Sequence, residues 1–334
     1  MTMDLLITRM RQDEIDLMPD FQRRDDIWGE AAQSRLIESL LIRIPLPAFY
    51  MDATNEDCWL VVDGLQRLST LKRFVIEKNL KLTGLEFLTQ LEAKGYDDLP
   101  RTFRRRIDET QVTIYLIEKG TPPGVKFNIF KRINTGGAPL TAQEIRHALN
   151  QGAATRLLAR LADSDAFKSA TDRGVNPKRM DDRECVLRFL AFVITPYTEY
   201  PVKKDFDSFL SDKMAEINAM NDVEQQRLEQ RFKRAMIAAN VIFGDEAFRK
   251  KYSPDAPRFP INKAIFESWS VNLDSLAEED LVRIVSRKSQ VVEGFMKLMH
   301  NRDFEAAVSS GTGDVKKVQK RFESIGNLLA EVMR

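Results

Sequence analysis

Apolar positions in the first 145 residues switch repeatedly between the spacing of a helix and that of a strand. A helix is expected over Glu30–Arg43, because four apolar residues share one face and prolines at positions 45 and 47 would end it. Short apolar runs predict strands, and other segments have helical spacing. The expected strands are Leu46–Met51, Trp59–Val62 and Val112–Ile117, and the further helices are Phe103–Asp108 and Val125–Ile133. This pattern predicts an α/β domain over residues 1–145.

The remaining residues, 146–334, show helical spacing with few strand signals. Just before them, Thr141 and Glu144 have the spacing of a capping box, which predicts the start of a helix. The clearest helices are expected at Asp182–Ile194, Phe206–Met220, Val223–Ile242, Leu276–Met299 and Val315–Met333. The polar segments 171–178 and 252–259 are expected to be exposed connections, although loops that face a ligand have the same composition. The predicted class is α+β, with an α/β domain followed by a mainly helical domain.

Composition narrows the range of functions. The chain has 51 Lys and Arg against 50 Asp and Glu, so its net charge of +1 does not indicate a nucleic-acid binder, although a local basic groove is compatible with it. Cys58, Cys185, His147 and His300 are the only cysteines and histidines, and their spacing matches no metal site. No stretch approaches the ~18 apolar residues of a membrane span, and the N-terminus lacks the features of a signal peptide. We therefore expect a cytoplasmic protein with no metal centre and no membrane contact.

The most informative run is WLVVDGLQRLSTLKRF, residues 59–74, where an apolar strand ends in Asp63-Gly64 and an amphipathic helix begins. Ligands of α/β domains bind at such strand ends, and the start of a helix offers unpaired N–H groups to an anion. Gly64 would admit the backbone close to phosphate, and Arg67 would bind phosphate oxygens. Asp63 would accept from a sugar hydroxyl or hold hydrated Mg²⁺, while Gln66 would orient water or a base edge. Asp-Gly is also typical of a turn and Asp63 of a helix N-cap, so the run alone leaves both interpretations open.

Two other runs carry polar residues that loops of the α/β domain can bring to this junction. In FQRRDDIW, Phe21 and Trp28 can anchor the segment while Gln22 and Arg23 project outwards; a surface arm with two apolar anchors is equally compatible. In FKRINTGGAPLTAQEIR, Arg132 and Asn134 leave a helix just before two glycines, which by themselves are typical of a helix C-cap. Both runs are candidates for the rim of a binding site.

A third run, RTFRRRID, places Arg104, Arg105 and Arg106 together on a short helix. This basic face is either solvated or in contact with the phosphates of DNA.

The runs FQR followed by Trp, LIESLLIRIPLP, VVDGLQRLSTL and FKRINTGGAPLTAQEIR, in this order and spacing, resemble the N-terminal domain family of GmrSD-type and SspE-type restriction factors. That family resembles the ParB and sulfiredoxin fold, and its signature is written DGQQR. Weaker similarity continues through RMDDRECVLRFLAF, FDSFLSDKM and SSGTGDVKKVQKRF, so it extends over nearly the whole chain. Leu65 departs from the DGQQR signature, which has Gln at that position. Because a Leu side chain cannot hydrogen-bond phosphate or water, hydrolysis of the nucleotide is less expected than its binding.

The resemblance implies a nucleotide-binding, often NTP-hydrolysing, sensor in prokaryotic defence against phage or modified DNA, with Mg²⁺ as the accompanying ion. Carried over to this chain, it implies catalytic roles for Asp63, Gln66 and Arg67. It also implies a nucleotide site made of Gln22, Arg23, Asp63, Gly64, Gln66, Arg67, Arg132 and Asn134.

Many relatives continue into an HNH nuclease domain, but two separated histidines cannot form such a centre, so cleavage of DNA is expected from a separate nuclease partner. Two alternatives stay open: a DNA-binding or metal-dependent nicking protein, and a non-enzymatic interaction scaffold. The sequence does not specify the nucleotide, the DNA feature sensed, the partner or whether the chain self-associates.

Overall fold

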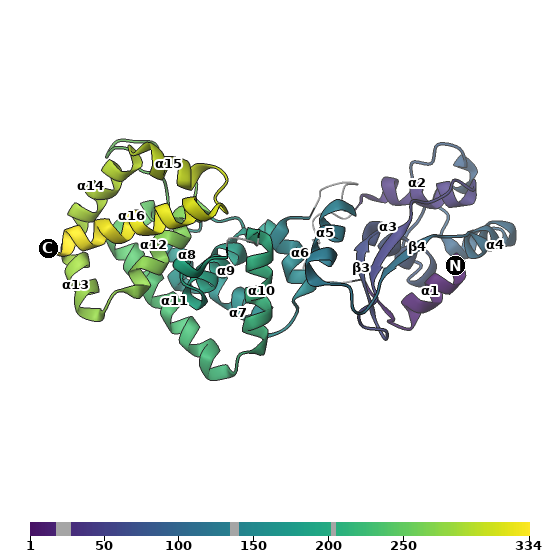
Figure 1. Cartoon of the computed structure of the whole chain (residues 1–334). Coiled ribbons are helices and arrows are strands. Elements are labelled where there is room, and N and C mark those ends of the chain that lie inside the picture. Colours follow the sequence, from purple (N-terminus) through teal and green to yellow (C-terminus); the bar gives the residue numbers. More distant parts are fainter. Residues whose placement is uncertain (18–27, 134–139, 202–204) are drawn as a thin grey trace. The chain divides into compact units, whose positions relative to one another are not determined.

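The computed structural model describes residues 1–17, 28–133, 140–201 and 205–334 (Figure 1). The chain divides into two compact units, Met1–Leu140 and Thr141–Arg334, called here the first and second units. The first unit contains a four-stranded sheet with helices, and the second is built mainly of helices. The predicted α+β class is therefore confirmed.

The sheet of the first unit has the strand order β1-β3-β2-β4 and mixed directions. Its strands are β1 (Ile15–Asp16), β2 (Phe49–Asp52), β3 (Trp59–Asp63) and β4 (Ile114–Ile117). β2 runs antiparallel to β3, whereas β1 is parallel to β3 and β4 is parallel to β2. Because Tyr50 pairs with Asp63, the end of β3 lies beside the beginning of β2. The three predicted strands are confirmed with boundaries moved by up to three residues, and β1 is an addition.

The helices of the first unit cover this sheet with apolar side chains. They are α1 (Met3–Arg11), α2 (Glu30–Leu41), α3 (Leu65–Leu71), α4 (Arg101–Glu109) and α5 (Pro123–Ile133), with a π-helical turn η2 (Lys72–Ile76) and 3₁₀ turns η3 (Thr89–Leu91) and η4 (Tyr96–Asp98). Leu6, Ile37, Val61, Leu71 and Phe74 are fully buried in one core. The helix predicted over Glu30–Arg43 is α2, which ends at Leu41. The helix α1 was not predicted.

A buried carboxylate fixes the long connection between α3 and α4. Glu38 of α2 is 3% exposed and accepts hydrogen bonds from the backbone N–H groups of Glu86, Phe87 and Leu88 at 2.7 to 3.0 Å. Burial alone would raise the pKa of Glu38, but these three donors bring it below its ordinary value. Ser34, one turn earlier, accepts from the N–H of Thr83. Polar residues of α2 therefore hold a connection that has little regular structure of its own.

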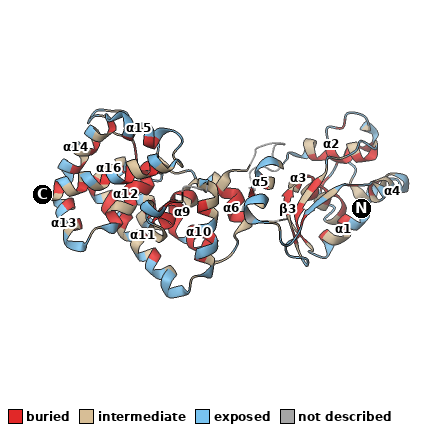
Figure 2. Cartoon of the chain, viewed as in Figure 1, coloured by how far each residue is buried: buried red, intermediate tan, exposed pale blue. Residues whose placement is uncertain are grey.

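The second unit consists of packed helices. They are α6 (Ala142–Leu149), α7 (Ala153–Ala162), α8 (Asp165–Ala170), α9 (Asp181–Ile194), α10 (Phe206–Ala219), α11 (Asp222–Phe243), α12 (Lys263–Ser275), α13 (Glu278–Ser286), α14 (Lys288–Met299), α15 (Arg302–Ser309) and α16 (Val315–Met333), with 3₁₀ turns η5 (Pro177–Arg179), η6 (Tyr197–Glu199) and η7 (Gly244–Glu246). α9 and α12 are largely buried and pack against each other (Figure 2). The predicted capping box is present, since Thr141 Oγ1 accepts from the N–H of Glu144 and its N–H donates to the Glu144 carboxylate.

The prediction of one helix over Leu276–Met299 is wrong. The segment forms α13 and α14, which are separated by Arg287 with φ −106° and ψ 25°. The Arg287 guanidinium donates to the carbonyl of Val332 at the end of α16. The bend keeps Ile284 and Val291 in the same core. Tertiary packing thus overrides a helical pattern that is continuous in the sequence.

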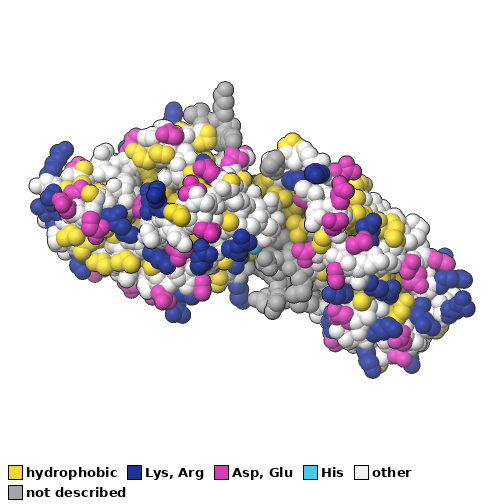
Figure 3. Space-filling model, turned by 90° about the horizontal axis from the view of Figure 1, so that it is seen from below, with side chains coloured by type: hydrophobic (Ala, Val, Ile, Leu, Met, Phe, Trp, Pro, Cys, Tyr) yellow, Lys and Arg dark blue, Asp and Glu magenta, His cyan; other side chains and the backbone are white. Residues whose placement is uncertain are grey.

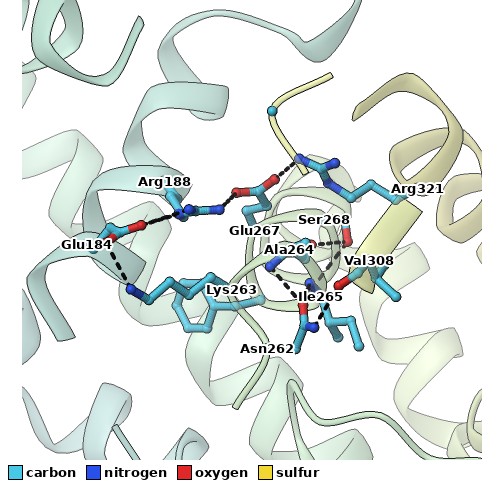
Figure 4. Close-up of polar contacts among 12 residues, drawn as sticks. Glu184, Arg188, Asn262, Lys263, Ala264, Ile265, Glu267, Ser268, Val308 and Arg321 are labelled. Atoms are coloured by element: carbon cyan, nitrogen blue, oxygen red, sulfur yellow. Dashed lines mark hydrogen bonds and ion pairs between the residues drawn. The ribbon is translucent and has the colours of Figure 1, made fainter. Parts of the chain in front are cut away.

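A chain of ion pairs runs through the helices of the second unit (Figure 4). Glu184 of α9 bonds Arg188 at 2.7 Å and Lys263 at 2.8 Å, and Arg188 bonds Glu267 of α12 at 3.1 Å. Glu267 in turn bonds Arg321 of α16, and both side chains are completely buried. Although burial opposes the charged forms, the neighbouring cations hold the pKa of Glu184 at about 2. Charged groups therefore link three helices that are distant in sequence.

The surface carries charges of both signs. Lys and Arg side chains are interspersed with Asp and Glu on the face drawn in Figure 3, in keeping with the net charge of +1. Within the described part of the chain, no helix combines the length and the apolar character needed to cross a bilayer.

Candidate functional site

The turn between β3 and α3 consists of one residue, Gly64, with φ 103°. This conformation lies in the region that favours glycine. A Cβ atom on Gly64 would lie 2.5 Å from Cδ1 of Phe49 and 3.1 Å from Nη2 of Arg67. Both the backbone conformation and the packing of Phe49 therefore require glycine here.

The guanidinium of Arg67 is directed towards the beginning of β2, and the residue is only 8% exposed. Nη1 donates to the carbonyl of Pro47, while Nη2 donates to the carbonyl of Ala48 at 3.1 Å and to Oδ2 of Asp63 at 2.8 Å. The guanidinium carbon also lies 4.4 Å from the centre of the Phe49 ring, within the range of a cation–π contact. This geometry favours a positioning role for Arg67, because both Nη atoms, which were predicted to bind phosphate, donate to protein groups.

Asp63 and Arg67 form a partly desolvated ion pair. Burial raises the pKa of Asp63 above its ordinary value, although Arg67 and the N–H of Gly64 act in the opposite direction. Burial likewise lowers the pKa of Arg67, and Asp63 opposes that shift. The Asp63 side chain keeps 26% of its surface exposed, compared with 10% for Arg67. Of the two, Asp63 is thus the group that a ligand can reach.

Gln66 connects the run FQRRDDIW to the junction of β3 and α3. Its Oε1 accepts a hydrogen bond from the backbone N–H of Trp28 at 3.1 Å. The carbonyl of Trp28 accepts from Nε2 of Gln33 at 2.8 Å, and Oε1 of Gln33 accepts from Arg73 at 2.7 Å. The structure therefore brings the last residue of FQRRDDIW against the first turn of α3.

The run FKRINTGGAPLTAQEIR begins in α5, which packs against β3. Lys126 of α5 pairs at 3.1 Å with Asp52, the last residue of β2, and both side chains are nearly buried. Asp52 also accepts from the N–H of Thr54. Arg132 lies in the last turn of α5 and is exposed. The helix that carries Arg132 is thus fastened to the sheet, with the Arg132 side chain accessible.

Three predicted site residues, Gln22, Arg23 and Asn134, lie outside the residues that the structure describes. Their contribution to the site stays a prediction.

The arginines predicted to contact DNA lie on α4, which packs against α1 and α2. Arg105 is exposed and pairs with Glu109 at 3.5 Å, and Arg104 is half-buried. Arg106 donates to the carbonyl of Leu41 at 2.9 Å and lies 5.0 Å from the ring centre of Phe103. Arg106 therefore connects α4 to α2, and Arg105 is the most accessible of the three.

Several residues that build the site were not predicted. Phe49 supports Arg67 and limits position 64, while Asp52 and Lys126 fasten α5. A signal for Asp52 was present in the sequence, because FYMD ends an apolar run in Asp just as WLVVD does at Asp63. Nothing in the sequence indicated the carbonyl acceptors of Arg67, since every residue has a carbonyl.

Among the residues that the structure describes, no three His, Cys, Asp or Glu side chains gather in a way that would hold a metal ion. Asp63 offers a single carboxylate that is already paired with Arg67.

Comparison with known proteins adds one match. No curated protein matches the chain. Residues 6–150 match the protein family described as "GmrSD restriction endonuclease, N-terminal domain". This range contains the junction at Asp63, the helix α5 and the capping box at Thr141. Residues 6–150 of this chain are thus a domain of the GmrSD N-terminal family.

Proposed function

We propose that the first unit is the nucleotide-binding regulatory domain of a prokaryotic restriction or anti-phage system, and that it controls the engagement of DNA or of a nuclease partner. The family match supports the restriction context. The observation that carries nucleotide binding is the hydrogen bond between Trp28 and Gln66, because it places the end of one polar run beside another at the end of β3. The packing of α5 on β3 brings the start of the run FKRINTGGAPLTAQEIR to the same strand.

In this proposal, Arg23 and Arg132 bind the phosphates, and Arg67 holds the turn in shape. Two charge-assisted hydrogen bonds contribute roughly 1.5 to 3 kcal/mol each, while millimolar binding requires about 4 kcal/mol. Both arginines are therefore needed for useful affinity. Mg²⁺ would arrive with the triphosphate and neutralise part of its charge, and Asp63 is the carboxylate that we propose beside it.

We propose that this domain binds an NTP and hydrolyses it slowly at most. Leu65 packs against the core of the first unit and has no group that bonds water. Oε1 of Gln66 already accepts from the N–H of Trp28, so the protein sets the orientation of this amide instead of leaving it free to position a water molecule. A nucleotide-dependent change in partner binding is therefore favoured over rapid hydrolysis.

Isothermal titration calorimetry with each NTP and Mg²⁺ tests the proposal. We expect one NTP to bind the wild type, and the Arg132→Ala and Arg23→Ala variants to bind roughly tenfold more weakly. Arg105→Ala removes an exposed arginine of the same unit and should bind as the wild type does. Absence of binding by every NTP, or an equal loss in the Arg105→Ala variant, would contradict the proposal.

A further inference from the structure

The second unit contains a cavity of about 620 Å³, which is within the usual size of a small-molecule site. Its walls come from α7, α8, the segment 171–177 and the first turn of α9. The polar composition of that segment was compatible with either a plain connection or a loop that faces a ligand, and the structure places it on the cavity wall. Nothing in the proposed nucleotide site involves these elements.

The lining is cationic. Arg160, Lys168, Arg173 and Arg183 face two acidic residues, a net charge of +2 in a chain whose total is +1. Arg160 pairs with Glu229 at 3.1 Å, and Lys168 pairs with an aspartate that is 83% exposed. The Lys168 pair is weak and can exchange for a stronger anionic partner, whereas Glu229, whose side chain is only 20% exposed, holds Arg160. The excess of positive charge at one cavity therefore indicates an anionic ligand.

Two arginines that do not line the cavity bond the loop that carries Arg173. Asp172 and Arg173 have φ values of 47° and 51°, a conformation that non-glycine residues seldom adopt. The buried guanidinium of Arg249 donates to the carbonyl of Thr171 at 3.2 Å, and Arg258 bonds Asp172 at 2.7 Å. Two arginines outside the cavity thus stabilise a strained turn whose effect is to place Arg173 on the cavity wall.

The carboxyl group of Asp182 adds a hydrogen-bond acceptor to the cavity lining. Asp182, in the first turn of α9, accepts a hydrogen bond from the N–H of Arg183 at 2.8 Å. Burial raises the pKa of Asp182, with the neighbouring N–H and charge of Arg183 opposing the shift. Phe167 contributes an apolar wall that is itself buried. The lining combines cations, carboxylate acceptors and an apolar surface, and a simple inorganic anion would use only the cations.

We propose that this cavity binds a phosphorylated small molecule of nucleotide size, with its phosphate against Arg173 and Arg183 and a donor group bonded to Asp182. The apolar wall contacts the remainder of the ligand. The two carboxylates in the lining disfavour the continuous negative charge of a DNA backbone. The ligand site is separate from the one at Asp63, which belongs to the first unit.

Calorimetry on the full chain tests this inference with inorganic phosphate, glucose 6-phosphate and the nucleoside 5′-monophosphates as probes. We expect at least one organic phosphate to bind more tightly than inorganic phosphate. Arg173→Ala and Arg183→Ala should each weaken binding roughly tenfold, because each removes a charge-assisted hydrogen bond. Lys297→Ala, which removes an exposed cation of α14, should leave it unchanged.

Asp182→Asn tests whether Asp182 bonds a donor group of the ligand or only repels its phosphate. Asparagine removes the charge but still accepts from the N–H of Arg183. Weaker binding by this variant supports a ligand donor at Asp182, whereas tighter binding shows that the carboxylate only repels the phosphate and contradicts the proposal. The proposal is also overturned if no probe binds, if Lys297→Ala weakens binding equally, or if duplex DNA alone binds through these arginines. Far-UV circular dichroism of each variant verifies that lost binding is not lost folding.

Discussion

The buried ion pairs of the second unit give a direct prediction for Glu184→Gln. Glu184 bonds both Arg188 and Lys263, and its pKa falls from the ordinary 4.5 to about 2. That difference corresponds to roughly 3 kcal/mol of folding free energy when the carboxylate is charged. Because the folded-state pKa lies below the unfolded one, this stabilisation is complete above about pH 4.5 and disappears as the pH falls towards 2.

Urea denaturation followed by far-UV circular dichroism over a pH series measures the effect. We expect the variant to be less stable than the wild type by roughly 3 kcal/mol at neutral pH, and this difference to shrink below pH 4.5. Glu279→Gln removes an exposed carboxylate of α13 and should change stability by less than about 0.5 kcal/mol. A difference between wild type and Glu184→Gln that is the same at all pH values would refute the assigned role of the charge.

Three further substitutions test the first unit and the start of the second. Gly64→Ala should destabilise the first unit by roughly 2 to 4 kcal/mol, because it adds both an unfavourable φ and a contact with Phe49; thermal unfolding measures this, and a shift within error would contradict it. Arg67→Lys should cost roughly 2 kcal/mol in urea denaturation, since one ammonium cannot replace a guanidinium that serves three acceptors; full stability with lost NTP binding would instead indicate a direct ligand contact. Thr141→Ala should lower the free energy of unfolding by about 1 kcal/mol through loss of the capping box, whereas Thr141→Ser should be close to wild type.

Local patterns predicted much of the secondary structure. The period change at Asp63 predicted the junction of β3 and α3, and the spacing of Val315–Met333 predicted α16 with its observed ends. The capping box was predictable because its two residues are three apart in the sequence. Features that depend only on neighbours along the chain can thus be inferred without a structure.

Contacts between distant residues could not be predicted in this way. The pairing of Glu267 with Arg321 joins residues 54 positions apart, and each alone is indistinguishable in sequence from a surface charge. Arg67 has the composition of a phosphate ligand, yet its partners include two backbone carbonyls whose positions depend on the pairing of β2 with β3. Similarly, the cationic cavity combines residues of three helices and a loop. The sequence supplied the residues in these cases, and the fold determined their partners.

The link between Trp28 and the junction has a consequence for how this region tolerates change. Trp28 contributes its main-chain N–H and carbonyl, which almost any residue at that position retains. Gln33 uses both the oxygen and the nitrogen of its amide, which only an amide of that length supplies, and Gln66 uses its Oε1, which needs an acceptor at the same reach. Mutational scanning should therefore find position 28 permissive for this attachment and positions 33 and 66 restrictive, so that the attachment depends on the two glutamines even though tryptophan is the more conspicuous residue.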